Sequence, residues 1–214
     1  MKPSLFYLIG YPASGKTTAL NKAIEISLTE FWYAAGDRDE QGFTHLDSTM
    51  GDSQYLPPTD GCWPRPINGN RVHSKPFKHT HYPNGFIQIG AERKYFGGTD
   101  TLALNIQPKV LEGLSGTSNR LYLAEGDRLS NIKFFTGVVG LGIRLQIVYI
   151  HVPKIEAEYR AYKRGHHFNE RWFRGRLTKV DNLVNHYKDK GLVTLDGKQP
   201  PEQVATALKE IING

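Results

Sequence analysis

The sequence predicts an α/β protein with a parallel sheet flanked by helices, and three observations carry that prediction. Residues 4–10, SLFYLIG, form a short apolar run that ends in glycine, as a buried strand does. A glycine-rich loop follows at once, and residues 17–30 then carry apolar side chains at helical spacing. Residues 31–36, FWYAAG, resemble a second strand, and the order strand, loop, helix, strand is typical of a parallel α/β sheet.

Residues 37–98 interrupt this alternation of strands and helices. Residues 37–84 hold six prolines and show no clear periodicity, and such a stretch is too long for an ordinary connection. We expect a substrate-side insertion over residues 37–98, with a short strand at 85–90. The chain as a whole, residues 1–214, is predicted to form a single domain.

Beyond the insertion the predicted elements resume in order. The expected strands are residues 120–126, 144–152 and 192–197, and the expected helices are residues 99–114, 131–142, 153–165, 169–191 and 200–214. Pro108 could kink or restart the first of these helices, and Gly175 could break the fourth. Residues 153–190 are rich in arginine and are predicted to form a lid over the site.

Charge and cysteine usage narrow the classes of function. No stretch approaches the roughly 20 apolar residues of a membrane helix, so we expect no membrane partner. Cys62 is the only cysteine, which fits a reducing compartment such as the cytoplasm. The net charge is +6, and positive charge gathers in residues 61–98 and 151–179, each with a net charge of +5. This balance favours polyanionic partners.

Residues 10–17, GYPASGKT, match the phosphate-loop pattern G-x-x-x-x-G-K-[ST] at every position. The glycines allow backbone N–H groups to surround a phosphate, and the following helix turns its positive dipole end to the same anion. Lys16 would reach the β- and γ-phosphates of ATP, Thr17 would ligate Mg²⁺, and Thr18 would bond the α-phosphate. The predicted nucleotide contacts are Gly10, Ala13, Ser14, Gly15, Lys16, Thr17 and Thr18. The loop alone does not separate a kinase from an ATPase or a GTPase.

An acid at the end of a neighbouring strand would complete a phosphate site, and residues 121–130, LYLAEGDRLS, supply it. Glu125 is expected to hold Mg²⁺ through water, and Asp127 to take the proton of an acceptor hydroxyl. Arg128 is expected to contact the substrate, although an ordinary polar turn would show the same residues. Asp100, at a predicted helix start, caps that helix or binds the acceptor hydroxyl and takes its proton, and one residue can do both.

Five arginines lie late in the chain: Arg160, Arg164, Arg171, Arg174 and Arg176. Two helices joined by a short polar stretch, with arginines on both sides, are typical of the lid of a small kinase. Arg171 and Arg174 would neutralise the charge on the transferring phosphoryl group, and Arg164 would contact the nucleotide. A solvated basic helix pair or a nucleic-acid patch would show the same pattern. The sequence has no N-K-x-D motif, which argues against a GTPase.

Further candidate contacts lie within the insertion. Asp37 and Arg38 follow the predicted second strand, where an acceptor could bind, and a polar turn is the competing interpretation. Arg93 could meet a phosphate of the substrate.

One cysteine and three histidines invite a zinc interpretation: Cys62, His73, His79 and His81. Their spacing fits no common zinc finger. We therefore expect these histidines to be solvated or to face phosphate.

Four segments, GYPASGKTT, FIQIGAERKYFGGTDTL, LAEGDRL and FRGRLTKVDNL, occur in this order and resemble small P-loop kinases of bacteriophages. The resemblance spans about residues 4–188 and is greatest to the kinases that phosphorylate 5-hydroxymethyluracil in phage DNA. It implies ATP-dependent phosphorylation of the hydroxymethyl group in DNA that contains this modified base, in the cytoplasm of the infected cell. Lys16 and Thr17 carry over to the nucleotide site, and Glu125, Asp127 and Asp100 carry over as acids in matching segments.

A base inside a duplex cannot reach a buried γ-phosphate, so such an enzyme must flip the base into a pocket. Residues 37–98 would supply that pocket. Two other functions remain open. The first is a kinase for a free nucleoside, nucleotide or other small metabolite. The second is a nucleotide-dependent nucleic-acid-binding module without transferase activity.

Overall fold

The computed structural model describes residues 2–35, 70–72, 77–90, 98–115, 120–164 and 169–214. In this part of the chain, strands form one sheet in the order β2-β3-β4-β5-β1-β6-β7. The strands are β1 (Ser4–Ile9), β2 (Asn70–Val72), β3 (His79–His81), β4 (Phe86–Ile89), β5 (Leu121–Glu125), β6 (Arg144–His151) and β7 (Val193–Asp196). The neighbouring pairs β4-β5, β5-β1, β1-β6 and β6-β7 are parallel, whereas β3 is antiparallel to both β2 and β4. The predicted parallel α/β sheet is confirmed.

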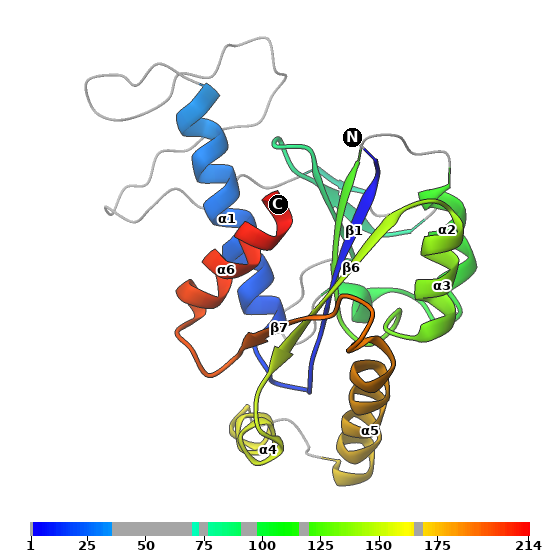
Figure 1. Ribbon diagram of the computed structural model, residues 1–214, viewed down its shortest axis with the longest axis vertical. Coiled ribbons are helices and arrows are strands. Elements are labelled where there is room, and N and C mark those ends of the chain that lie inside the picture. Colours follow the sequence, from blue (N-terminus) through cyan, green and yellow to red (C-terminus); the bar gives the residue numbers. More distant parts are fainter. Residues whose placement is uncertain (1, 36–69, 73–76, 91–97, 116–119, 165–168) are drawn as a thin grey trace.

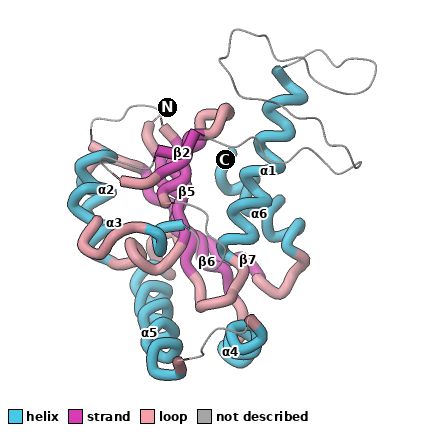
Figure 2. The backbone as a smooth tube through the Cα atoms, turned by 180° about the vertical axis from the view of Figure 1, so that it is seen from behind, coloured by secondary structure: helices cyan, strands magenta, loops and turns pink. Residues whose placement is uncertain are grey.

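Helices cover both faces of this sheet (Figure 1). They are α1 (Lys16–Ala35), the 3₁₀ turn η1 (Gly98–Thr101), α2 (Gln107–Leu114), α3 (Ile132–Gly140), α4 (Lys154–Lys163), α5 (Glu170–Tyr187) and α6 (Pro201–Asn213). The view from behind shows α1 and α6 together on one side of the strands, and α2 and α3 on the other (Figure 2). Each face therefore has its own hydrophobic core.

Strand β1 shows how the sequence divides its side chains between the two cores. Phe6 and Leu8 pack into the core that α1 and α6 cover. Leu5, Tyr7 and Ile9 pack into the opposite core, with α2, α3 and α5. Successive side chains of a strand point to opposite faces, so an apolar run without alternation is the pattern of a strand buried on both sides.

The helices begin at residues that the sequence marks. Asn131 and Asn169 cap α3 and α5, because each side-chain oxygen accepts a hydrogen bond of 2.9 Å from a backbone N–H three residues on. Proline occupies the first turn of α2 and of α6, where its missing N–H has no helical partner to lose. Pro108 thus lies in the first turn of α2, and Gly98–Thr101 form the separate turn η1. Helix α5 continues through Gly175 without a break.

The predicted strand at residues 31–36 is wrong, because α1 continues through Ala35. Both edges of β1 are taken by β5 and β6, so no place beside β1 remains for a strand that follows α1 directly. Among the described residues after α1, the first strand that joins the parallel part of the sheet is β4, which lies inside the predicted insertion. No helix in the described ranges is both long and apolar enough to cross a membrane.

Candidate active site

The phosphate loop joins the end of β1 to the start of α1 and is tightly curled. A Cβ atom at Gly10 would lie 2.6 Å from Ser14 Oγ and 2.7 Å from the Ile150 carbonyl oxygen. Ala13 and Gly15 both have positive φ angles, of 63° and 94°. The loop therefore needs glycine at its first position for space and favours it at Gly15 for backbone conformation.

Lys16 lies against the loop that precedes it. Its Nζ donates hydrogen bonds of 3.0 Å to the Gly10 carbonyl and 2.9 Å to the Tyr11 carbonyl. Desolvation by the surrounding protein lowers the pKa of Lys16, and the nearby Glu125 carboxylate opposes that shift. The Lys16 ammonium is partly desolvated and lies against the phosphate loop. An anionic phosphate bound there would compensate its positive charge.

Glu125 meets the phosphate loop from the end of β5. The pairing of β1 with β5 sets Leu8 opposite Glu125, so the two strands end at the same edge of the sheet. Thr17 Oγ1 donates a hydrogen bond of 3.0 Å to Glu125 Oε1. Glu125 is only 3% exposed, and burial raises its pKa, while Lys16 and Thr17 lower it in part. A hydroxyl and a carboxylate are oxygen ligands of the kind that Mg²⁺ prefers, so this pair fits the predicted metal contacts.

Three glycines bring the ends of β4 and β5 and the turn η1 into backbone contact. A Cβ atom at Gly98 would lie 2.4 Å from the Glu125 carbonyl oxygen, and one at Gly90 would lie 1.9 Å from the Gly98 carbonyl oxygen. A Cβ atom at Gly126 would lie 2.8 Å from Thr99 Oγ1. All three glycines have positive φ angles, so side chains are excluded by both space and conformation.

Asp100 anchors the turn that follows β5. Its Oδ1 accepts hydrogen bonds of 2.8 Å from the Asp127 N–H and 3.0 Å from the Arg128 N–H. The alternative that Asp100 caps a helix over residues 99–114 is wrong, because Asp100 belongs to η1 and α2 starts only at Gln107. Within the described residues, only Oδ1 of this carboxylate has a hydrogen-bond partner.

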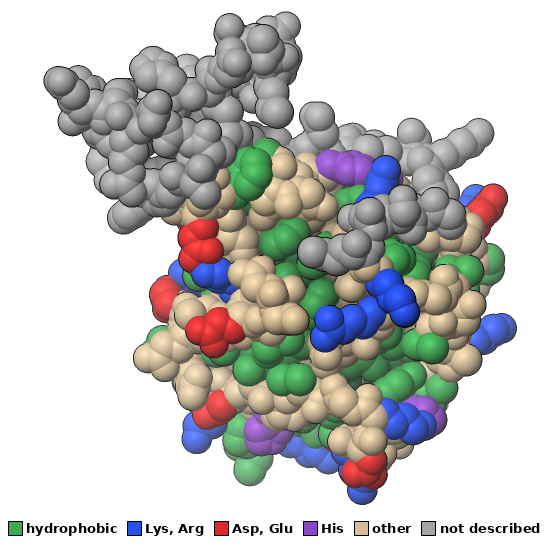
Figure 3. All heavy atoms as spheres, turned by 45° about the horizontal axis from the view of Figure 1, so that its top comes forward, with side chains coloured by type: hydrophobic (Ala, Val, Ile, Leu, Met, Phe, Trp, Pro, Cys, Tyr) green, Lys and Arg blue, Asp and Glu red, His purple; other side chains and the backbone are tan. Residues whose placement is uncertain are grey.

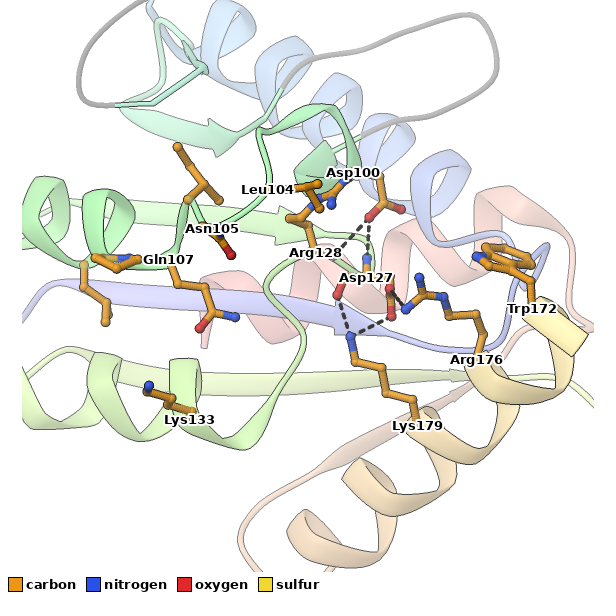
Figure 4. Close-up of a pocket in the computed structure, with 13 residues that line it drawn as sticks. Asp100, Leu104, Asn105, Gln107, Asp127, Arg128, Lys133, Trp172, Arg176 and Lys179 are labelled. Atoms are coloured by element: carbon orange, nitrogen blue, oxygen red, sulfur yellow. Dashed lines mark hydrogen bonds and ion pairs between the residues drawn. The ribbon is translucent and has the colours of Figure 1, made fainter.

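Asp127 is bound by two cations of α5. Its Oδ1 lies 2.8 Å from Lys179 Nζ, and its Oδ2 forms an ion pair with Arg176. Lys179 also donates a hydrogen bond of 2.7 Å to the Asp127 carbonyl oxygen. Figure 4 shows the resulting chain of contacts, from Asp100 through Asp127 to the α5 side chains. Asp100 and Asp127, which the sequence suggested separately as candidate bases, thus lie near each other, and the partners of Asp127 come from a helix face that the sequence analysis did not predict.

A cavity of about 950 Å³ opens beside these carboxylates. Asp100, Asp127, Arg128 and Lys179 line it together with apolar side chains that include Leu104 and Trp172. We call it the acceptor cavity. Its volume is at the upper end of the range of about 300–1,000 Å³ that is usual for ligand sites.

A second cavity, of about 570 Å³, lies along the phosphate loop. Ala13, Ser14, Gly15 and Thr18 line it from the loop and α1, and Arg164 lines it from the end of α4. The structure therefore brings Arg164 to the predicted nucleotide contacts. We call this space the nucleotide cavity.

The model of the family described as P-loop Nucleotide Kinase3 matches residues 70–213. The chain belongs to this P-loop nucleotide kinase family. The match begins beyond the phosphate loop, so the loop and the family model support the assignment from separate parts of the chain.

Solved structures align with this family member over nearly its full length. A gluconokinase from Sinorhizobium meliloti 1021 is 12% identical, with a TM-score of 0.49 over 99% of this chain and 92% of the other. A deoxyadenosine kinase from M. mycoides with bound dATP is 12% identical, with a TM-score of 0.43 over 98% of this chain and 100% of the other. A shikimate kinase from Acinetobacter baumannii is 13% identical, with a TM-score of 0.43 over 99% and 93%. Among curated proteins, none matches the sequence.

In this P-loop nucleotide kinase family member, the predicted lid arginines of α5 differ in whether they reach the acceptor cavity. Arg171 and Arg174 are exposed, and Arg174 forms an ion pair with Glu170 one helical turn away. Neither lines the acceptor cavity, whereas Arg176 does. The prediction that Arg171 and Arg174 reach the phosphate site is therefore not supported by their positions.

The side chains that sequence reasoning missed are Trp172, Lys179 and Lys133, and it did not choose Arg176 from the arginine cluster. Trp172, Arg176 and Lys179 stand at the helical spacing i, i+4, i+7 and share one face of α5. That spacing was visible in the sequence. The buried residues Phe173 and Val180 mark the side of α5 that packs against the core. Combined with them, the i, i+4, i+7 spacing would have singled out the neighbouring side, which faces the acceptor cavity.

Some predicted contacts lie outside the described residues: Asp37, Arg38, Arg93, Cys62 and His73. His79 and His81 lie on β3, where their Nε2 atoms are 2.9 Å apart. Among the residues that the structure describes, no group of three or more His, Cys, Asp or Glu side chains could hold a metal ion.

Proposed function

We propose that this protein is a kinase that transfers the γ-phosphate of ATP to a hydroxyl group. One observation carries the proposal: the Thr17–Glu125 hydrogen bond joins the phosphate loop to the strand end that leads directly to Asp127. A phosphate held by the loop would therefore lie next to carboxylates that can accept a proton. The family membership and the complete phosphate-loop pattern support the same reaction.

Each residue has a role that follows from its position. The loop N–H groups and Lys16 would hold the phosphates, and Thr17 with Glu125 would hold Mg²⁺, which offsets negative charge on the phosphates. The acceptor oxygen forms a bond to the γ-phosphorus while the bond from that phosphorus to the β,γ-bridging oxygen breaks, and ADP leaves. The hydroxyl proton goes to a carboxylate in the acceptor cavity.

Asp100 is the better candidate for this general base. Asp127 uses both carboxylate oxygens in contacts to Lys179 and Arg176, so neither oxygen is open to an acceptor hydroxyl. Asp100 has one oxygen without a partner in the described part of the chain, and it lines the acceptor cavity. Asp127 would then position Arg176 and Lys179 for the charge that develops on the phosphoryl group.

For the acceptor we propose the 5-hydroxymethyl group of 5-hydroxymethyluracil in DNA. The four segments that resemble the phage kinases support this choice, and so does the positive charge of residues 151–179. The acceptor cavity offers Trp172 and Leu104 as apolar surfaces for a base, beside cations for a phosphate backbone.

The deciding experiment offers labelled ATP and Mg²⁺ with three acceptors in parallel: DNA that contains 5-hydroxymethyluracil, ordinary DNA, and a mixture of free nucleosides and nucleotides. We expect label on the modified DNA alone. Label on a free nucleoside or nucleotide would support the second candidate, a small-molecule kinase, which the family's description as nucleotide kinases favours. Label on no acceptor, together with ATP-dependent DNA binding, would support a binding module without transferase activity.

A further inference from the structure

The acceptor cavity carries more positive than negative charge. Asp127 is paired with two of its cations, and Asp100 binds backbone N–H groups instead of a cation. Two cations of the wall, Arg128 and Lys133, remain without an acidic partner among the described residues. An occupant of this cavity would therefore be anionic.

Arg128 shows this lack of a partner most clearly. Its backbone N–H binds Asp100, but its side-chain Nε is buried and has no hydrogen-bond partner in the described part of the molecule. A buried hydrogen-bond donor on a charged group lowers the stability of the fold when it has no partner, and native proteins rarely contain such a donor. In Figure 4 the Arg128 side chain lies between Asp100 and Leu104, on the wall of the acceptor cavity. An anionic group of the acceptor placed there would satisfy the guanidinium and lie close to the candidate base.

Lys133 provides a second, separate cation. It is the second residue of α3 and is exposed, and no described residue pairs with its ammonium. Figure 4 shows Lys133 and Trp172 at opposite ends of the cavity wall, with Arg128 between them. Because the Arg128 and Lys133 side chains stand apart on this wall, each can bind an anionic group of its own. Two anionic groups joined by a spacer could contact both side chains.

We propose that Arg128 and Lys133 bind two successive backbone phosphates of the acceptor, and hence that the acceptor is a nucleotide within a strand. This inference rests on the proposed function. A free nucleoside carries no phosphate, and a mononucleotide carries one. A nucleotide within a strand has a phosphate on each side of its sugar, which matches two separated cations on the wall that also holds a proton-accepting carboxylate.

The test compares KM for short single-stranded acceptors that need no base flipping. One is a trinucleotide with a central 5-hydroxymethyluracil and two natural phosphodiester linkages. Two others each replace one linkage by an uncharged methylphosphonate. For the wild type we expect each replacement to raise KM by about tenfold, the usual effect of losing one charge-assisted hydrogen bond. The kcat should change little, because the lost contacts are made to the backbone linkages and not to the hydroxyl that reacts.

Variants then assign each linkage to one side chain. Lys133→Met should raise KM for the natural trinucleotide by about tenfold and should abolish the sensitivity to one methylphosphonate only. Arg128→Met should do the same for the other linkage, and Arg128→Lys should restore part of the effect by keeping the charge. Lys109→Met is the matched control, because Lys109 is exposed on neighbouring α2 but does not line the cavity.

Salt dependence of binding gives a readout that needs no transfer. Each lost phosphate contact should reduce the slope of log K against log salt by about 0.7 for a single strand. An unchanged slope and an unchanged KM in both variants would overturn the two-phosphate proposal while leaving the kinase function intact. A free nucleoside with the same KM as the trinucleotide would overturn it too. Transfer to no acceptor would reject the proposed function, and the slopes would still decide whether Arg128 and Lys133 bind phosphates.

Discussion

At the scale of single residues, the two carboxylates Asp100 and Asp127 have different environments. Asp100 binds backbone N–H groups through one oxygen, whereas Asp127 is held by two cations of α5. We expect Asp100→Asn to lower kcat by about 100-fold with little change in the Kd of ATP, the range typical of losing a general base. Asp127→Asn should instead raise the acceptor KM, because it releases Arg176 and Lys179.

Steady-state kinetics with both variants would check this division of roles. Normal kcat in Asp100→Asn would show that Asp100 is not the base. In that case Asp127 would be the next candidate despite its ion pairs.

Glu125 leads to a prediction about pH. Burial raises its pKa, so the folded state holds the proton more tightly than the unfolded state does. The charged form of Glu125 therefore lowers the free energy of unfolding. This loss is absent below the unfolded pKa of about 4.3, and it is complete once the pH has risen through the folded-state pKa. Glu125→Gln should make the nucleotide-free protein more stable than the wild type at pH 8, and the difference should shrink toward pH 4.5.

Urea unfolding at several pH values would measure this difference, and the same variant should lose about 100-fold or more in transfer rate. A variant that is less stable than the wild type at pH 8 would contradict the assigned cost of the buried carboxylate.

At the scale of elements, α5 is attached to the phosphate loop as well as to the turn after β5. The Tyr11 hydroxyl donates a hydrogen bond to Asp181 of α5, and Lys154 of α4 lies 2.8 Å from the same carboxylate. Asp181→Asn should therefore loosen α5 and, with it, the contacts of Arg176 and Lys179. We expect the acceptor KM to rise severalfold and the free energy of unfolding to fall by about 1–3 kcal/mol, with the Kd of ATP nearly unchanged.

Asp189→Asn is a suitable control, because Asp189 is exposed in the turn after α5. Equal acceptor KM values in the two variants would show that the Tyr11–Asp181 contact stabilises the fold without positioning α5. Chemical denaturation and acceptor kinetics together separate these outcomes.

The elements also show what local sequence can and cannot predict. Strand β1 and the phosphate loop were predictable because each has a pattern of its own. The run at residues 31–36 was not, because its aromatic and alanine residues suit either structure, and in the fold α1 continues through Ala35. The bridge from Asp100 to the turn after β5 could not be predicted either, because it joins residues that are distant in sequence.

At the scale of the whole molecule, the site depends on strand order. Strands β1 and β5 are separated by more than one hundred residues, yet they are neighbours in the sheet and place the phosphate loop beside Glu125. On the face drawn in Figure 3, Lys and Arg side chains are spread among hydrophobic ones rather than gathered in one patch. On this face the positive charge would therefore act as a broad attraction toward polyanions, and specificity would depend on the cavities.

Ligand binding should stabilise the whole fold through the phosphate loop. ATP·Mg²⁺ at 100 times its Kd should add about 2.7 kcal/mol to the free energy of unfolding. Lys16→Met should lose most of this gain while keeping its affinity for DNA, because Lys16 lies at the loop and not in the acceptor cavity. Thermal unfolding with and without ATP·Mg²⁺ measures the gain. A variant that keeps the full shift would show that Lys16 does not bind the nucleotide.

The contact among Gly90, Gly98 and Gly126 has a consequence for how the site can vary over evolutionary time. A side chain at any of these positions would collide with backbone or with the Thr99 hydroxyl, next to Glu125. We therefore expect a saturation mutagenesis library to tolerate almost no replacement at these three positions, while an exposed charged residue such as Arg171 accepts many. A search for distant relatives that weighs only charged side chains would overlook the positions where selection permits the least change.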